Sequence, residues 1–152
     1  MKKIYFSILC ISILLLTGCS KEKYFTCKID LYNDIQEYEL NAEYKIYYKN
    51  SFVTKIEKEE IYISENEDTL DYFNEYKNLE YSNINNLYGG TTYNIDLKED
   101  RVKMVANIDM NLVDISKMIK DKYIDRDYVV SNKLTTGGIK NIYKEKGAIC
   151  DI

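Results

Sequence analysis

One cysteine in this chain stands where its thiol could receive a lipid. Two lysines precede a short apolar run, Ile4 to Leu16, and the run ends in Leu16-Thr17-Gly18-Cys19. A positive start, a short apolar stretch and small residues before a cleavage point are typical of a secretory signal peptide. A cysteine directly after the cleavage point is typical of a bacterial lipobox, in which the thiol is alkylated with a diacylglyceryl group. The sequence therefore predicts a cleaved signal peptide over residues 1–18, a lipobox at Leu16, Thr17 and Gly18, and lipidation of Cys19.

Two other interpretations of this segment fit the residues less well. Ile4 to Leu16 is 13 residues long, whereas a membrane-spanning helix needs about 20. An ordinary signal peptide commonly has alanine at positions −3 and −1, where this chain has Leu16 and Gly18. Fatty acyl chains such as palmitate suffice for stable anchoring when two are present. We therefore expect a protein held at the cell membrane, on its extracytoplasmic face, through diacylglyceryl-Cys19.

The remaining cysteines of the processed chain are Cys27 and Cys150, since Cys10 leaves with the signal peptide. Outside the cytoplasm, such a leftover pair predicts a disulfide, and two unpaired thiols are the alternative. A zinc site would need further ligands, but the sequence has no histidine and no third thiol in the domain. We therefore expect a disulfide between Cys27 and Cys150.

Carboxylates are the other candidate reactive groups, because the chain has no histidine to act as the base that activates a serine or cysteine nucleophile. Glu59-Glu60 and the acidic stretch from Glu65 to Asp68 could supply the carboxylate pair of a glycan hydrolase. A solvated strand edge and a helix N-terminus favoured by negative charge explain these residues better. We therefore expect no enzymatic activity, no catalytic residue and no cofactor.

The stretch from Asp121 to Asp127 invites comparison with a calcium loop. A calcium loop of the EF-hand type needs a glycine at its sharp turn and a terminal glutamate. Here Arg126 stands between the aspartates and the glycine is absent. Gly89-Gly90 likewise lacks the spacing of a phosphate-binding loop and predicts a turn. We expect no metal site in either segment.

Tyrosine is the residue type with the most potential for binding, since the chain has 16 tyrosines. A tyrosine ring combines a flat apolar face with a polar tip, which suits sugars and peptides. The alternative is that tyrosine fills strand positions in a chain that lacks tryptophan. The tyrosines considered for exposure are Tyr47, Tyr72, Tyr76, Tyr81 and Tyr88.

Alternating apolar and polar residues predict the strands that must position these side chains. We expect strands over residues 24–32, 38–48, 52–64, 93–97 and 102–110, with the last two forming a hairpin. The third strand changes parity, which predicts a bulge near Lys58 to Glu60. Ser64 and Glu67 resemble a capping box for a helix that ends before Asn83. Further helices are expected after Asp114 and from Thr136, the latter ending at Gly147.

This order of elements, β-β-β-α-β-β-α-α, predicts an α+β fold. Strands joined by short turns pair antiparallel, and half-polar strands leave one face of the sheet in water. Helices must then cover the other face of the predicted five-stranded sheet. Removal of residues 1–18 leaves 134 of the 152 residues, enough for one core. We expect a tether over residues 19–23 and a single domain over residues 24–152.

The chain resembles the YehR-like family of small bacterial lipoproteins, whose function is uncharacterised. The features that carry this resemblance are the lipobox, residues 48–53, residues 88–93, residues 108–115 and the ending Gly147-Ala148-Ile149-Cys150. The resemblance implies an anchored α+β domain and brings no catalytic residues.

The processed chain has 19 basic and 25 acidic side chains once Lys2 and Lys3 are removed, a net charge of −6. Such a domain is not attracted to nucleic acid. We therefore expect a non-enzymatic binding domain for an envelope protein or a cell-wall component. The alternative is a module that binds a small molecule or a metal ion.

Overall fold

Six strands form one antiparallel sheet within residues 21–151, the part of the chain that the computed structural model describes. The strands are β1 (Lys23–Asn33), β2 (Tyr38–Lys49), β3 (Phe52–Ile63), β4 (Thr91–Leu97), β5 (Arg101–Asp109) and β8 (Ile149–Cys150). Their order across the sheet is β4-β5-β3-β2-β1-β8. The long strands follow from strict alternation, as in β2, where Ala42, Tyr44 and Ile46 are buried and Glu43 is exposed.

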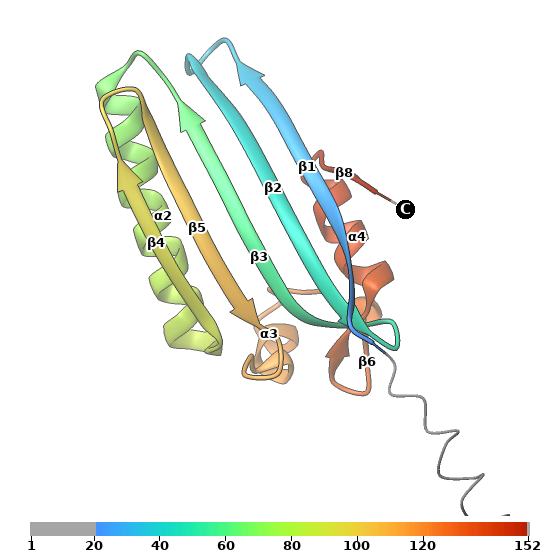
Figure 1. Cartoon of the computed structure of the whole chain (residues 1–152). Helices are drawn as coiled ribbons and strands as arrows, with labels where there is room; N and C mark the ends of the chain where they lie inside the picture. The colour runs from blue at the N-terminus through green and yellow to red at the C-terminus, as the bar shows by residue number, and fades with distance from the viewer. Residues whose placement is uncertain (1–20, 152) are drawn as a thin grey trace, which may run out of the picture.

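Helices cover one face of the sheet, and Figure 1 shows two of them on different halves of it. The helices are α2 (Glu67–Tyr88), α3 (Ile115–Lys120) and α4 (Thr136–Glu145). A 3₁₀ turn, η1 (Arg126–Tyr128), and a short ribbon of β6 (Val129–Val130) and β7 (Lys133–Leu134) connect α3 to α4. α2 lies behind β4 and β5, whereas α4 lies behind β1 and β2, where Tyr143 stacks on Tyr44 with ring centroids 4.3 Å apart. The predicted α+β fold, with an antiparallel sheet and helices on one face, is confirmed.

The prediction of five strands was wrong, because the end of the chain adds β8 beside β1. Cys150 pairs with Cys27 across the two strands, and the predicted disulfide joins them. The amide of Asp151 also donates to the carbonyl of Thr26, at 2.8 Å. A strand of two residues has no alternation to detect, so the sequence pattern missed it.

The predicted bulge near Lys58 to Glu60 was also wrong. The register between β2 and β3 shifts between Tyr47 and Tyr48, opposite Val53 and Lys55. From Ile56 onward the inward positions are even-numbered, and Glu60 and Tyr62 are buried there while Ile61 and Ile63 are not. The prediction of a bulge assumed that Ile61 and Ile63 point inward. The strand is regular there, and the charged residue Glu60 takes the inward position instead.

Both ends of α2 differ from the prediction. Asn66 caps the helix, with its side chain accepting from the amide of Thr69 at 3.3 Å. Ser64 instead accepts from the amide of Asn66 and donates to the carbonyl of Glu37. The helix continues through the asparagine-rich stretch to Tyr88, because buried Ile84 and Tyr88 continue its inward face.

The other helix ends agree with the sequence. Asp114 caps α3 by accepting from the amide of Lys117, and Gly147 follows the end of α4 with a φ of 87°. Among residues 21–151, no helix is both long enough and apolar enough to cross a membrane. The predicted signal peptide, the lipobox residues Leu16, Thr17 and Gly18, and Cys19 lie outside the described residues.

Candidate functional site

A group of charged and phenolic side chains lies buried between β3 and α2. Glu60 points inward from β3 and is 4% exposed. Its two carboxylate oxygens accept hydrogen bonds from Tyr44 (3.0 Å) and Tyr62 (3.3 Å). Lys77 of α2 pairs with Glu60 at 3.1 Å and with Glu80 at 2.8 Å. These contacts fix the middle of α2 against the sheet.

Lys58, two residues before Glu60 on β3, extends this buried group. Its ammonium donates to the hydroxyl of Tyr81 at 3.0 Å. Burial lowers the pKa of Lys58 to about 8, although Glu60 opposes the shift. Burial alone would raise the pKa of Glu60, but Lys58 and Lys77 hold it below its usual value. The carboxylate therefore stays charged, with both oxygens engaged by neighbours, which suits a structural role better than proton transfer.

The carboxylates singled out in the sequence do not converge. Glu59 lies on the outer face of the sheet, where it pairs with Lys103 at 3.0 Å, while Glu60 lies on the inner face. Glu65 and Asp68 are exposed at the start of α2. The structure thus brings no pair of these acids together around an open site.

Among the aspartates from Asp121 to Asp127, Asp125 serves as a local cap. Asp125 accepts from the amide of Asp127 at 2.9 Å and begins η1. Within residues 21–151, no three His, Cys, Asp or Glu side chains are grouped as a metal site would require.

The tyrosines divide between core and surface. Four of the tyrosines considered from the sequence lie on α2. Tyr81 and Tyr88 are buried on its inward face, whereas Tyr72 and Tyr76 are exposed on its outer side. Tyr47 lies on the outer face of the sheet. Of the five tyrosines considered, Tyr72 and Tyr76 are therefore the two whose rings are exposed for binding.

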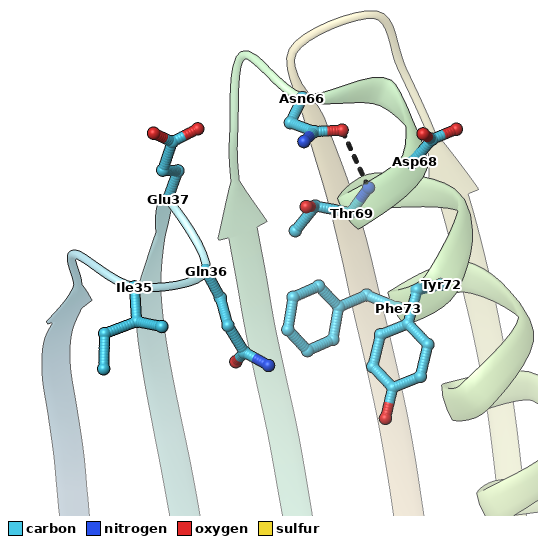
Figure 2. A pocket seen from close by; sticks show the side chains of 8 residues that line it. All are labelled: Ile35, Gln36, Glu37, Asn66, Asp68, Thr69, Tyr72 and Phe73. Carbon is cyan, nitrogen blue, oxygen red and sulfur yellow. Dashed lines mark hydrogen bonds between the residues drawn. The ribbon is translucent and has the colours of Figure 1, made fainter.

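An open pocket of about 500 Å³ lies between the turn that joins β1 to β2 and the first turns of α2. Figure 2 shows Ile35 and Gln36 of the turn on one side and Tyr72 and Phe73 of α2 on the other. The lining residues are Ile35, Gln36, Glu37, Asn66, Asp68, Thr69, Tyr72 and Phe73. We call this space the turn pocket.

The walls of the turn pocket are held by contacts behind them. Phe73 stacks on Tyr62 with ring centroids 4.0 Å apart and meets Tyr38 edge-on at 4.8 Å. In the turn, the side chain of Asn33 accepts from the amides of Ile35 and Gln36. The pocket is therefore formed before any ligand arrives.

The exposed apolar side chains of α2 continue from this pocket along the helix. We define the α2 stripe as Tyr72, Tyr76, Leu79 and Leu87, together with the neighbouring Tyr123. The rings of Tyr72 and Tyr76 stack with centroids 5.8 Å apart. Tyr76, Leu79, Leu87 and Tyr123 line a second pocket of about 330 Å³. The stripe thus joins two pockets on one side of the molecule.

Sequence reasoning missed the turn pocket and the buried charges. Ile35 stands in a turn, where no periodicity gives its side chain a direction. Lys58 and Glu60 did carry a signal, because they lie between inward-facing Ile56 and Tyr62 at strand spacing. Their partners on α2 could not be found from that spacing.

Comparison with known proteins identifies the fold. No protein-family model matches the chain, and no curated protein matches its sequence. The NMR structure of the E. coli YehR protein matches with a TM-score of 0.56 and 16% identity, covering 87% of this chain and 92% of that one. The NMR structure of a protein from Streptococcus pneumoniae TIGR4 matches with a TM-score of 0.50 and 13% identity, covering 89% and 88%. The resemblance to YehR is confirmed as a resemblance of fold.

Proposed function

We propose that this YehR-like chain is a lipid-anchored extracytoplasmic lipoprotein whose domain binds an envelope protein and catalyses no reaction. One observation carries the proposal: the turn between β1 and β2 lies at the opposite end of β1 from the start of that strand (Figure 1), and this turn lines the turn pocket. β1 has 11 residues, which at about 3.3 Å per residue gives a span of about 35 Å. A domain anchored through Cys19 would present this pocket away from the bilayer.

The side chains of the domain support binding rather than catalysis. The charged groups between β3 and α2, Lys58, Glu60 and Lys77, are engaged with one another and with tyrosines. The open surface instead offers apolar and aromatic side chains, which supply much of the free energy of protein recognition.

Crosslinking in living cells tests this proposal. A photoreactive residue at Ile35, which is 89% exposed, should yield one discrete crosslinked product in the membrane fraction. The same residue at Tyr24, exposed on the outer face near the start of β1, is the matched control and should yield none. Equal products from both positions, or none from Ile35, would contradict the proposal.

A small molecule is the second candidate ligand, because the turn pocket lies in the usual range of ligand sites, about 300–1,000 Å³. A thermal-shift screen of sugars, short peptides and divalent cations tests it. A ligand at a hundredfold over its Kd should stabilise the chain by about 2.7 kcal/mol. The Phe73→Ala chain should lose that shift.

A further inference from the structure

We infer that the turn pocket and the α2 stripe together bind a basic, apolar segment of a polypeptide. The inference rests on the proposed function and names the chemistry of the partner. It predicts a segment that carries lysine or arginine beside leucine-like or aromatic side chains. Three features of the surface carry it, namely its exposed apolar side chains, its charge and its pocket.

The α2 stripe leaves several large apolar side chains exposed to solvent. Tyr72 is 57% exposed, Leu79 62% and Leu87 48%. Scattered apolar side chains are normal on a protein surface, but a contiguous stripe that joins two pockets is typical of an interaction site. The helix otherwise needs no such residues, because Leu70, Phe73, Tyr81, Ile84 and Tyr88 already bury its inward face.

The charge of α2 itself is negative. α2 contains five carboxylates, and its one basic residue, Lys77, is buried and paired with Glu60 and Glu80. Asp68 and Glu75 are exposed beside the stripe and make no ion pair within residues 21–151. A partner that covers the stripe therefore gains from positive charges at its edges.

The turn pocket combines apolar side chains and carboxylates around a space that one side chain of a partner could enter. Ile35, Phe73 and Tyr72 form apolar walls, and Glu37 and Asp68 also line the pocket, with their carboxylates above the rings and pointing away from them (Figure 2). A lysine or arginine could lay its aliphatic stem on the rings and its charge toward these carboxylates. The chain makes this contact within itself, since Lys55 lies 3.9 Å above the ring of Tyr47.

Other occupants fit this surface less well. A second copy docked through α2 would bring carboxylates against carboxylates. The exposed residues of basic α4, Gly137, Asn141, Lys144 and Glu145, offer no apolar side chain to fill the pocket. An anionic lipid surface is repelled by the carboxylates beside the stripe.

Binding of two designed peptides to the full chain in non-ionic micelles tests the inference. Both peptides are amphipathic helices of about 18 residues with the same leucine face, and their polar faces carry lysine in one and glutamate in the other. Fluorescence anisotropy should show at least about tenfold tighter binding of the lysine peptide. The preference should shrink at high salt, because exposed charges are screened.

Two matched double variants locate the binding surface. Asp68→Lys with Glu75→Lys should weaken binding of the lysine peptide by at least about tenfold. Asp30→Lys with Glu39→Lys makes the same charge change on the outer face of the sheet and should change binding less than about twofold. Far-UV circular dichroism checks that both variants keep their fold. Tyr76→Ala should also weaken binding, whereas Tyr32→Ala should not.

Equal binding of the two peptides, or equal weakening by both double variants, would overturn the inference. Self-association of the chain that Asp68→Lys with Glu75→Lys abolishes would also overturn it, because a second copy would then be the occupant. A discrete crosslink from Ile35 together with no peptide preference would retain the proposed function and exclude only the basic partner.

Discussion

Lys77 of α2 and Glu60 of β3 form an ion pair, Nζ to Oε2 3.1 Å, and the two side chains are only 11% and 6% exposed. The ion pair connects the sheet to the helix layer, because Glu60 lies on β3 of the sheet and Lys77 lies on α2, the helix that follows β3 in the chain. Burial of two charges is costly unless each is matched, and here Tyr44, Tyr62 and Glu80 complete the set of partners. The ion pair therefore fixes one position of the helix on the sheet, and with it the wall of the turn pocket.

Replacement of Lys77 by methionine should remove the cation that forms the ion pair with buried Glu60. We expect the free energy of unfolding to fall by about 3 kcal/mol, because a buried charge that loses its partner is strongly destabilising. Lys98→Met removes an exposed partner of Asp96 and should cost less than about 1 kcal/mol. Urea unfolding followed by circular dichroism measures both. Equal losses would contradict the role given to the buried pair.

The stability of the chain should pass through a maximum at mildly alkaline pH. The pKa of Lys58 is about 8 in the folded chain against 10.5 when unperturbed. Between these values the unfolded chain holds more protons, so the free energy of unfolding rises with pH, by on the order of 1 kcal/mol. Lys58→Met should abolish this rise.

Above about pH 10 the free energy of unfolding should fall as the pH rises, the reverse of its change at lower pH. Burial, helped by the charge of Glu60, raises the pKa of Tyr44, Tyr62, Tyr81 and Tyr143 in the folded chain. The unfolded chain then loses protons that the folded chain keeps, and stability falls steeply. Urea midpoints at about pH 7, 9 and 11 follow both effects. A profile that is flat from pH 8 to 11 would exclude this account.

Loss of the disulfide between Cys27 and Cys150 should destabilise the fold, although the sheet should still form. The two cysteines are 123 residues apart, and closing so long a loop contributes about 5 kcal/mol in the chain-entropy model. Cys27→Ala with Cys150→Ala should unfold at a lower urea concentration than the oxidised chain. Addition of a thiol reductant should lower the urea midpoint of unfolding of the wild-type chain. It should leave the urea midpoint of the double variant unchanged. An effect of the reductant on both would point to another cause.

Two adjacent glycines of α4 should respond oppositely to alanine. A Cβ on Gly138 would lie 2.5 Å from Cβ and 2.7 Å from the carbonyl oxygen of Tyr128, whereas one on Gly137 would meet nothing within 4 Å. We expect Gly138→Ala to cost about 1–3 kcal/mol through overpacking and Gly137→Ala to stabilise the helix by about 0.5–1 kcal/mol. Thermal unfolding of the two variants compares them directly. Similar shifts would show that α4 does not pack on Tyr128 as described.

Cys19→Ser should block lipid attachment and leave an unprocessed precursor that keeps its signal peptide. Incorporation of radiolabelled fatty acid measures the attachment, and gel mobility reports the processing. Cys27→Ser, which changes the fold and not the lipobox, should still carry the label. Label that persists on the Cys19→Ser chain would remove the lipoprotein assignment.

The strands were predictable because their two faces meet different surroundings. In β2, Ala42, Tyr44 and Ile46 face the helices while Glu43 and Lys45 face water, so alternation alone gives the strand and its inward side. The same reasoning failed in β3, where Glu60 faces inward. A charged residue at an inward position is stable only through partners such as Tyr44 and Lys77, and these are set by tertiary packing.

The site was less predictable than the fold. Exposure of Tyr72 and Tyr76 could be suspected from their number and spacing on a helix. The opposite wall of the turn pocket comes from Ile35, in a turn more than thirty residues earlier in the chain. Only the pairing of β2 with β3 brings that turn beside the start of α2, and no local pattern encodes this proximity.

The pairing of β1 along its whole length has a mechanical consequence. Its partners on β2 run from Tyr48, opposite Lys23, to Tyr38, opposite Asn33. Tension that enters at Lys23 and leaves through β3 at the far end of the sheet would load these hydrogen bonds in parallel, as shear, rather than opening them one after another. Any peeling from the start of β1 would stop at Cys27, where the covalent link to Cys150 carries the load. A domain paired in this way resists a pull along the direction of β1.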